Sequence, residues 1–139
     1  MAVPQFSARS RCGASNMPIL GQCYTRNEIA DTHGGGRIEY LPNVAGRIVC
    51  ACLRTDPAFN PEAPHVILPG RGPKREHWAE VLGEQKGPIP VYLKRARNRW
   101  EYVGDYEVER RSRSPEEIEE REAQTGRPVT SMIYMRPAR

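Results

Sequence analysis

The sequence predicts an α+β domain, built as a small, curled and mostly antiparallel β-barrel flanked by two or three helices. Three observations indicate this class. Strand patterns outnumber helix patterns, a hairpin pattern stands in the middle of the chain, and the elements follow the order α-β-β-β-α-β-β-α-β. A chain of 139 residues has the length of one domain and can bury a real core.

The ordered domain is expected to span residues 23–139, after a flexible N-terminal arm of residues 1–22. The arm shows neither helical nor strand periodicity. The first helix begins at Thr25, because Thr25 and Glu28 have the spacing of a capping box, and it should end near Thr32, before a run of three glycines.

Strand patterns alternate with turn residues through the next part of the chain. Residues 37–41 have a strand pattern and residues 43–46 a turn pattern. Residues 46–54 are apolar on both faces, which is typical of a buried central strand. A proline-rich loop at 55–64 leads into a short strand at 65–68.

The second half of the chain predicts a helix, a hairpin, a helix and a last strand. Residues 74–86 carry apolar side chains at helical spacing, and residues 89–95 and 100–110 form the hairpin. Ser114 and the proline after it open a helix that Gly126 ends. Residues 129–135 form the last strand.

Composition excludes several classes of protein. No apolar run approaches the ~20 residues of a membrane helix, and the N-terminus lacks the apolar stretch of a secretory signal. Four cysteines are too few for a disulfide scaffold and suit a reducing compartment, so we expect a cytoplasmic protein, or a nuclear one in a eukaryote. The net charge of +4, carried by 18 arginines and three lysines, is compatible with a nucleic-acid partner.

The hairpin segment 94–108 is the most informative part of the sequence. Side chains alternate between the two faces of a strand, so Trp100, Tyr102 and Tyr106 share one face of the second strand, with Gly104 leaving a gap between the tyrosines. Such a face predicts a pocket for a flat base. Asp105 or Asn98 would give hydrogen bonds to the edge of the base.

Four cations precede this aromatic face at the tip of the hairpin: Lys94, Arg95, Arg97 and Arg99. Cations that hold phosphates beside rings that stack on bases are the combination that nucleic-acid binding requires. The alternative is that the rings form the core face of an amphipathic strand and that the arginines are simply solvated.

A second basic segment follows the strand at 65–68. Arg71 lies between two glycines, and Lys74 and Arg75 open the next helix, whose free N–H groups could face a phosphate. No Gly-Lys-Ser/Thr follows, so the segment is not a nucleotide P-loop, and it could equally be a plain turn. Together with the hairpin tip it could form one basic cleft.

The sequence predicts neither a metal site, a cofactor nor a catalytic centre. Cys50 and Cys52 are flanked by apolar residues, which favours buried structural thiols over ligands. The three histidines form no zincin or deaminase pattern. We therefore expect a binding module rather than an enzyme.

A resemblance to known domains rests on the hairpin residues. The run from Trp100 to Val108 (WEYVGDYEV), preceded by GPIPV at 87–91, resembles the hairpin of SRA-type domains of the PUA-like superfamily, which also includes EVE and ASCH domains. The resemblance implies a curved barrel that reads nucleic acid. Many such domains flip a modified cytosine into an aromatic pocket, and many are fused to nucleases in modification-dependent restriction. Val103 stands here where the SRA signature has aspartate, so the base specificity does not carry over.

The span from Tyr24 to Met135 also resembles a family of domains without an assigned activity, which shares YTR at 24–26 and an NP-x-AP motif at 60–64.

Three functions compete on this basis. The first is a module that binds nucleic acid, DNA in preference to RNA, through the basic segments and the aromatic pocket, with a nuclease as partner or fused domain. The second is a small ASCH-type ribonuclease that uses Lys94 or Tyr102. The third is a protein–protein interaction domain. The sequence does not indicate the oligomeric state.

Overall fold

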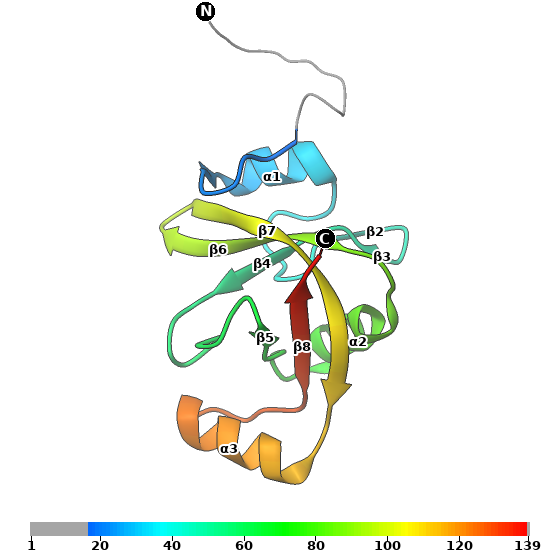
Figure 1. The fold of residues 1–139 in the computed structure, drawn as a ribbon, viewed down its shortest axis with the longest axis vertical. Coiled ribbons are helices and arrows are strands. Elements are labelled where there is room, and N and C mark those ends of the chain that lie inside the picture. The colour runs from blue at the N-terminus through cyan, green and yellow to red at the C-terminus, as the bar shows by residue number, and fades with distance from the viewer. Residues whose placement is uncertain (1–16, 139) are drawn as a thin grey trace, which may run out of the picture.

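The computed structural model describes residues 17–138, and there three helices surround a mixed, mostly antiparallel sheet (Figure 1). The helices are α1 (Arg26–His33), α2 (Pro73–Glu84) and α3 (Pro115–Thr125). The strands are β1 (Cys23–Tyr24), β2 (Asn43–Val44), β3 (Arg47–Ile48), β4 (Ala51–Arg54), β5 (Val66–Ile67), β6 (Ile89–Ala96), β7 (Arg99–Ser112) and β8 (Met132–Pro137). The α+β class is therefore confirmed.

The main sheet has the order β4-β6-β7-β8-β5, with β1 added to β7. Among the described strands the β4–β6 pair alone is parallel, and β2 and β3 form a separate two-stranded hairpin. Within the described residues β4 and β5 do not pair, so the sheet stays open and does not close into the predicted barrel. The free edge of β4 is instead covered by the segment before it, because Cys52 N–H donates to the carbonyl of Tyr40 at 2.8 Å.

The start of the domain follows the predicted pattern. The Thr25 side chain accepts from the Glu28 N–H, and the Glu28 carboxylate accepts from the Thr25 N–H, which completes the capping box of α1. Of the expected arm, residues 1–16 lie outside the described residues. Gly21 and Gln22 lie beside β7, where Gly21 N–H donates to Tyr102 O at 2.9 Å and Tyr102 N–H donates to Gln22 O at 3.0 Å.

Two strand predictions need correction. Residues 37–41 form no strand, and the predicted strand 46–54 is divided into β3 and β4. Between the two strands, Val49 N–H donates to the carbonyl of Pro42, so the chain leaves the β2–β3 hairpin before it joins the main sheet. Apolar composition on both faces predicted the burial of this segment but could not reveal the break.

The sheet buries a different cluster on each face. On one face, side chains of β4, β6, β7 and β8 pack with Ala79 and Leu82 of α2. On the other face, Ile29 of α1 packs with Cys50, Cys52, Tyr92 and Trp100. Both cysteines are buried free thiols, as the sequence predicted.

A bulge in β7 changes which face its side chains join. Tyr102 pairs with Tyr92, but Gly104 pairs with Val91, so Val103 is an extra residue without a partner in β6. Gly104 takes a φ of +118°, a conformation that other residues rarely adopt. Because side chains alternate with a period of two, the extra residue reverses the faces, and Tyr106 lies opposite Trp100 and Tyr102. The prediction that the three rings share one face is therefore wrong.

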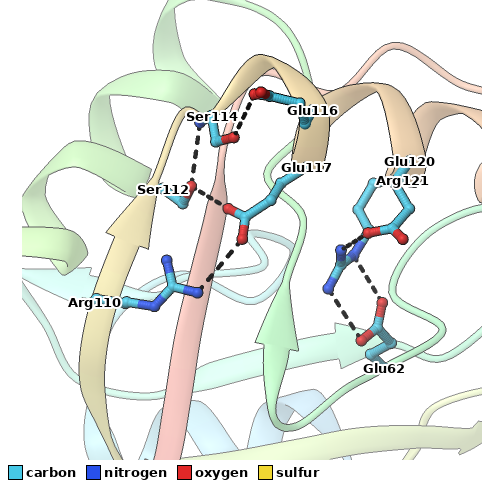
Figure 2. Close-up of polar contacts among 8 residues, drawn as sticks. All are labelled: Glu62, Arg110, Ser112, Ser114, Glu116, Glu117, Glu120 and Arg121. Carbon is cyan, nitrogen blue, oxygen red and sulfur yellow. Dashed lines mark hydrogen bonds and ion pairs between the residues drawn. The ribbon is translucent and has the colours of Figure 1, made fainter.

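Helix α3 is held largely by polar contacts (Figure 2). None of its residues is fully buried. Arg121, whose side chain is only 11% exposed, lies between Glu62 and Glu120, with its Nε 2.8 Å from Glu62 Oε2. At the start of the helix, Glu117 accepts from the Ser112 hydroxyl and lies 3.5 Å from Arg110. Arginines therefore pair with two glutamates of this helix, Glu117 and Glu120.

The side-chain amide of Gln85, just after α2, pairs with the backbone of Ile48 in β3. Its Oε1 accepts from Ile48 N–H at 2.9 Å, and its Nε2 donates to Ile48 O at 2.8 Å. Ile48 is buried, so no solvent would replace these two bonds.

We expect Gln85→Ala to lower the free energy of unfolding by about 1–3 kcal/mol, because it leaves the buried amide and carbonyl of Ile48 unpaired. Urea unfolding followed by circular dichroism measures the change. Gln124→Ala, at an exposed position of α3, is the matched control and should change stability by less than about 0.5 kcal/mol. Equal effects of the two substitutions would contradict this role for Gln85.

Candidate functional site

A pocket of about 440 Å³ opens between α2, β4, the segment that carries Tyr40 and the loop that carries Phe59. Five of the side chains that line it are cationic: Arg26, Arg54, Lys74, Arg75 and Arg127. Four are aromatic: Tyr40, Phe59, Trp78 and Trp100. Among the described residues that line it, only Glu39 carries a carboxylate.

Trp100 contributes a buried hydrogen-bond donor to this pocket. The residue is 7% exposed, and its Nε1–H has no hydrogen-bond partner among the described residues. The guanidinium of Arg26 lies 5.1 Å from the centroid of the indole ring, and Lys94 Nζ lies 5.8 Å from it. An unpaired buried donor costs free energy, which an acceptor brought to it would recover.

Arg26 is fixed from both ends. Its backbone N–H donates to Asn98 Oδ1 at 3.0 Å, and its Nη2 donates to the carbonyl of Glu39 at 2.8 Å. The Nε of Arg26 is a second buried donor without a partner in the described part of the chain. Asn98, which has a φ of 53° in the β6–β7 turn, thus positions the first residue of α1.

Two arginines lie against the ring of Phe59. Their guanidinium carbons, of Arg54 and Arg127, are 4.0 and 4.2 Å from its centroid. Arg54 also pairs with Asp56 at 2.8 Å, and Arg127 Nη1 donates to the carbonyl of Ala58 at 2.8 Å. Residues 54–59 and the segment after α3 therefore meet at the pocket, although they are far apart in the sequence.

Buried Asn60 holds this loop in place. Its Nδ2 donates to Arg54 O at 3.1 Å, and its Oδ1 accepts from Leu68 N–H at 2.8 Å. On the opposite wall, the Tyr40 hydroxyl donates to the carbonyl of Arg75 at 2.8 Å. Burial raises the pKa of Tyr40, so the phenol keeps this proton at neutral pH. These hydrogen bonds join the walls of the pocket to β4 and α2.

The structure separates the five residues predicted to form a base pocket. Trp100 lines the pocket and Asn98 supports Arg26, but Tyr106 is buried in the core beneath α2. Tyr102 and Asp105 pair with each other, because the Tyr102 hydroxyl donates to Asp105 Oδ1 at 2.6 Å. Burial, together with this hydrogen bond, raises the pKa of Tyr102.

Of the cations predicted to bind phosphates, some lie at the pocket and others do not. Lys74 and Arg75 line the pocket, and Lys94 approaches it over Trp100. Arg71, Arg97 and Arg99 are exposed outside the lining. Arg95 is exposed too and pairs with Glu101 at 2.7 Å.

Sequence reasoning did not select much of the pocket. It missed Arg26, Arg54, Phe59, Trp78 and Arg127. A signal existed for Arg26, which is part of the YTR motif, and for the segment that ends at Asn60, which opens the NP-x-AP motif. No local pattern marked Arg127, which reaches the site only through the fold.

Residues 17–138 contain no group of three or more histidine, cysteine or carboxylate side chains that could hold a metal ion. Within the same range, no helix has the length and apolarity needed to cross a bilayer.

The fold is similar to part of a solved restriction enzyme. The structure is that of the Type IV phosphorothioation-dependent restriction endonuclease ScoMcrA, with a TM-score of 0.51 and 14% sequence identity. The match covers 87% of this chain but 28% of the endonuclease chain. At this identity the likeness establishes a shared fold and no more.

Sequence comparison gives the family. No curated protein sequence matches the chain. The model of a domain of unknown function, DUF6697, matches residues 23–136, which is most of the chain, and the protein therefore belongs to that family.

Proposed function

We propose that this protein is a nucleic-acid-binding module that holds one nucleotide of its ligand in the 440 Å³ pocket. The observation that carries the proposal is the pocket lining, which combines four aromatic residues, five cations and the unpartnered, buried indole N–H of Trp100.

Each feature of the pocket is suited to bind one part of a nucleotide. Trp78 is half-buried, so part of its ring is open to stack on a base. Arg54 and Lys74 are exposed cations that can hold phosphates, and arginine can do so with two parallel hydrogen bonds. The Trp100 N–H would donate to an acceptor on the base.

Cations that are not part of the pocket lining extend the proposed interface. Arg71 precedes α2, and Lys94, Arg95, Arg97 and Arg99 lie at or near the tip of the β6–β7 hairpin. In the proposal they bind backbone phosphates on either side of the nucleotide in the pocket.

The fold shared with part of a restriction endonuclease supports DNA over RNA as the ligand. A modified or flipped base would suit a pocket that admits a single nucleotide. Because the match covers 28% of the endonuclease chain, a nuclease activity would come from a partner or a fused domain.

We expect the protein to bind single-stranded DNA with a marked salt dependence, because the cations of the pocket displace counterions from the phosphates. Arg54→Gln combined with Arg127→Gln should weaken binding and reduce the slope of log K against log salt by about one to two. Fluorescence anisotropy over a salt series measures both.

Arg136→Gln is the matched control, because Arg136 pairs with Glu107 away from the pocket. Absence of binding at about 50 mM salt, or a slope near zero, would overturn the proposal.

The two tryptophans allow a direct test of the pocket. Trp78→Phe leaves Trp100 as the single tryptophan and keeps an aromatic ring at position 78. In this variant, DNA should quench the Trp100 fluorescence with nearly unchanged affinity. Trp100→Phe should weaken binding about tenfold, because it removes the buried N–H donor but keeps a ring.

Affinities are compared for variants whose unfolding curves show them to be folded. Binding that leaves Trp100 fluorescence unchanged and survives Trp100→Phe would locate the ligand elsewhere, for example on the hairpin tip.

A further inference from the structure

Two arginines of the pocket lining cover the ring of Phe59. The guanidinium carbon of Arg54 lies 4.0 Å from the centroid of the ring, and that of Arg127 lies 4.2 Å from it. A guanidinium is nearly as wide as a phenyl ring, and like charges repel, so each of the two takes a face of its own. A base could not stack on this ring without displacing one of them.

Each of these arginines is held at a second point by the loop that carries Phe59. Arg54 Nη2 lies 2.8 Å from Asp56 Oδ2, and Arg127 Nη1 donates to the carbonyl of Ala58 at 2.8 Å. These are the side-chain hydrogen bonds that the two guanidiniums form within the described part of the chain. Because a guanidinium has five N–H donors, both arginines keep donors for a ligand.

A second ring covered by arginines, that of Tyr134 in β8, provides a comparison outside the pocket lining. The guanidinium carbons of Arg110 and Arg121 lie 4.0 and 5.9 Å from its centroid. Arg110 pairs with Glu117, and Arg121 pairs with Glu62. At this ring both positive charges are therefore matched by carboxylates of the protein itself.

The two arginines at Phe59 are neutralised much less completely. Arg127 forms no ion pair within 4 Å among the described residues. The side chains of the Arg54–Asp56 pair are 48% and 52% exposed, so water weakens their attraction. A phosphate could therefore be bound by both arginines, whose planar groups suit two parallel hydrogen bonds to it.

We propose that Phe59 is a positioning residue, which holds Arg54 and Arg127 for contact with the backbone phosphates of the bound strand and does not itself stack on the base. This inference rests on the proposed function. It also orients the nucleotide in the pocket. The backbone of the nucleotide faces the loop of Phe59, and its base faces the wall formed by α2, where Trp78 is half-buried.

The first test compares two single-stranded ligands of about 12 nucleotides, oligo-deoxyadenosine and an abasic strand that keeps the sugars and phosphates but has no bases. Phe59→Leu should weaken the binding of both about tenfold, because two freed arginines must be ordered on binding. Trp78→Leu should weaken the binding of oligo-deoxyadenosine about tenfold and that of the abasic strand less than about twofold, because it removes a ring that stacks on a base. Fluorescence anisotropy at about 50 mM salt measures all four affinities.

A double-mutant cycle tests whether Phe59 acts through the arginines. In a protein that already carries Arg54→Gln and Arg127→Gln, Phe59→Leu should change the affinity for oligo-deoxyadenosine by less than about twofold. If Phe59→Leu cost the same factor with and without the two glutamines, the ring would contact the ligand directly, and the inference would be wrong.

Two further variants serve as controls. Phe59→Tyr keeps a ring under both guanidiniums and should bind both strands as the wild type does. Tyr134→Leu removes the other ring covered by arginines, which lies outside the pocket lining, and should also leave both affinities unchanged. Should Phe59→Leu fail to fold, Phe59→Met replaces it with the same expectations, because it too fills the space without a ring.

The outcomes separate this inference from the proposed function. If Phe59→Leu weakened the binding of oligo-deoxyadenosine but not that of the abasic strand, Phe59 would stack on the base. The inference would then fail and the nucleic-acid proposal would stand. Absence of binding of the wild-type protein to either strand would overturn both.

Discussion

Strand β7 contributes large side chains to the clusters on both faces of the sheet, because the bulge at Val103 shifts the alternation of its side chains. Before the bulge, Trp100 and Tyr102 pack beneath α1, and beyond it Tyr106 enters the core beneath α2. Figure 1 shows this strand running along most of the molecule. A strand with unbroken alternation would place all three rings on one side, and one of the two cores would lose a large apolar residue.

The pocket depends on this arrangement because its parts come from distant segments that the sheet holds in place. Trp100 comes from β7, Arg26 from the start of α1 and Arg54 from the end of β4. Hydrogen bonds from the side chains of Asn60 and Tyr40 join the loops of the pocket to β4 and α2. A binding site on loops requires such support if its side chains are to be positioned before the ligand arrives.

The distribution of charge matters more than its sum. The net charge of +4 is modest because α3 carries several glutamates, and Figure 2 shows arginines pairing with three of the glutamates around this helix. The pocket has the opposite balance, with five cations and one carboxylate in its lining. Positive potential is therefore concentrated where aromatic rings are also accessible, which is the arrangement that attracts a polyanion to a specific place.

By itself, the sequence determined the α+β class, the three helices, the capping box of α1 and the glycine that ends α3, the central hairpin and the burial of Cys50 and Cys52, because local periodicity and capping residues encode these features. It also singled out Trp100, Lys74 and Arg75, which do line the pocket. The open sheet, the reversal at Val103 and the approach of Arg127 to Phe59 were decided only by the tertiary structure. These features depend on contacts between residues far apart in the chain. Gly104 inside the strand pattern is compatible with a bulge, but only the register of β7 against β6 shows that the side chains after it change faces.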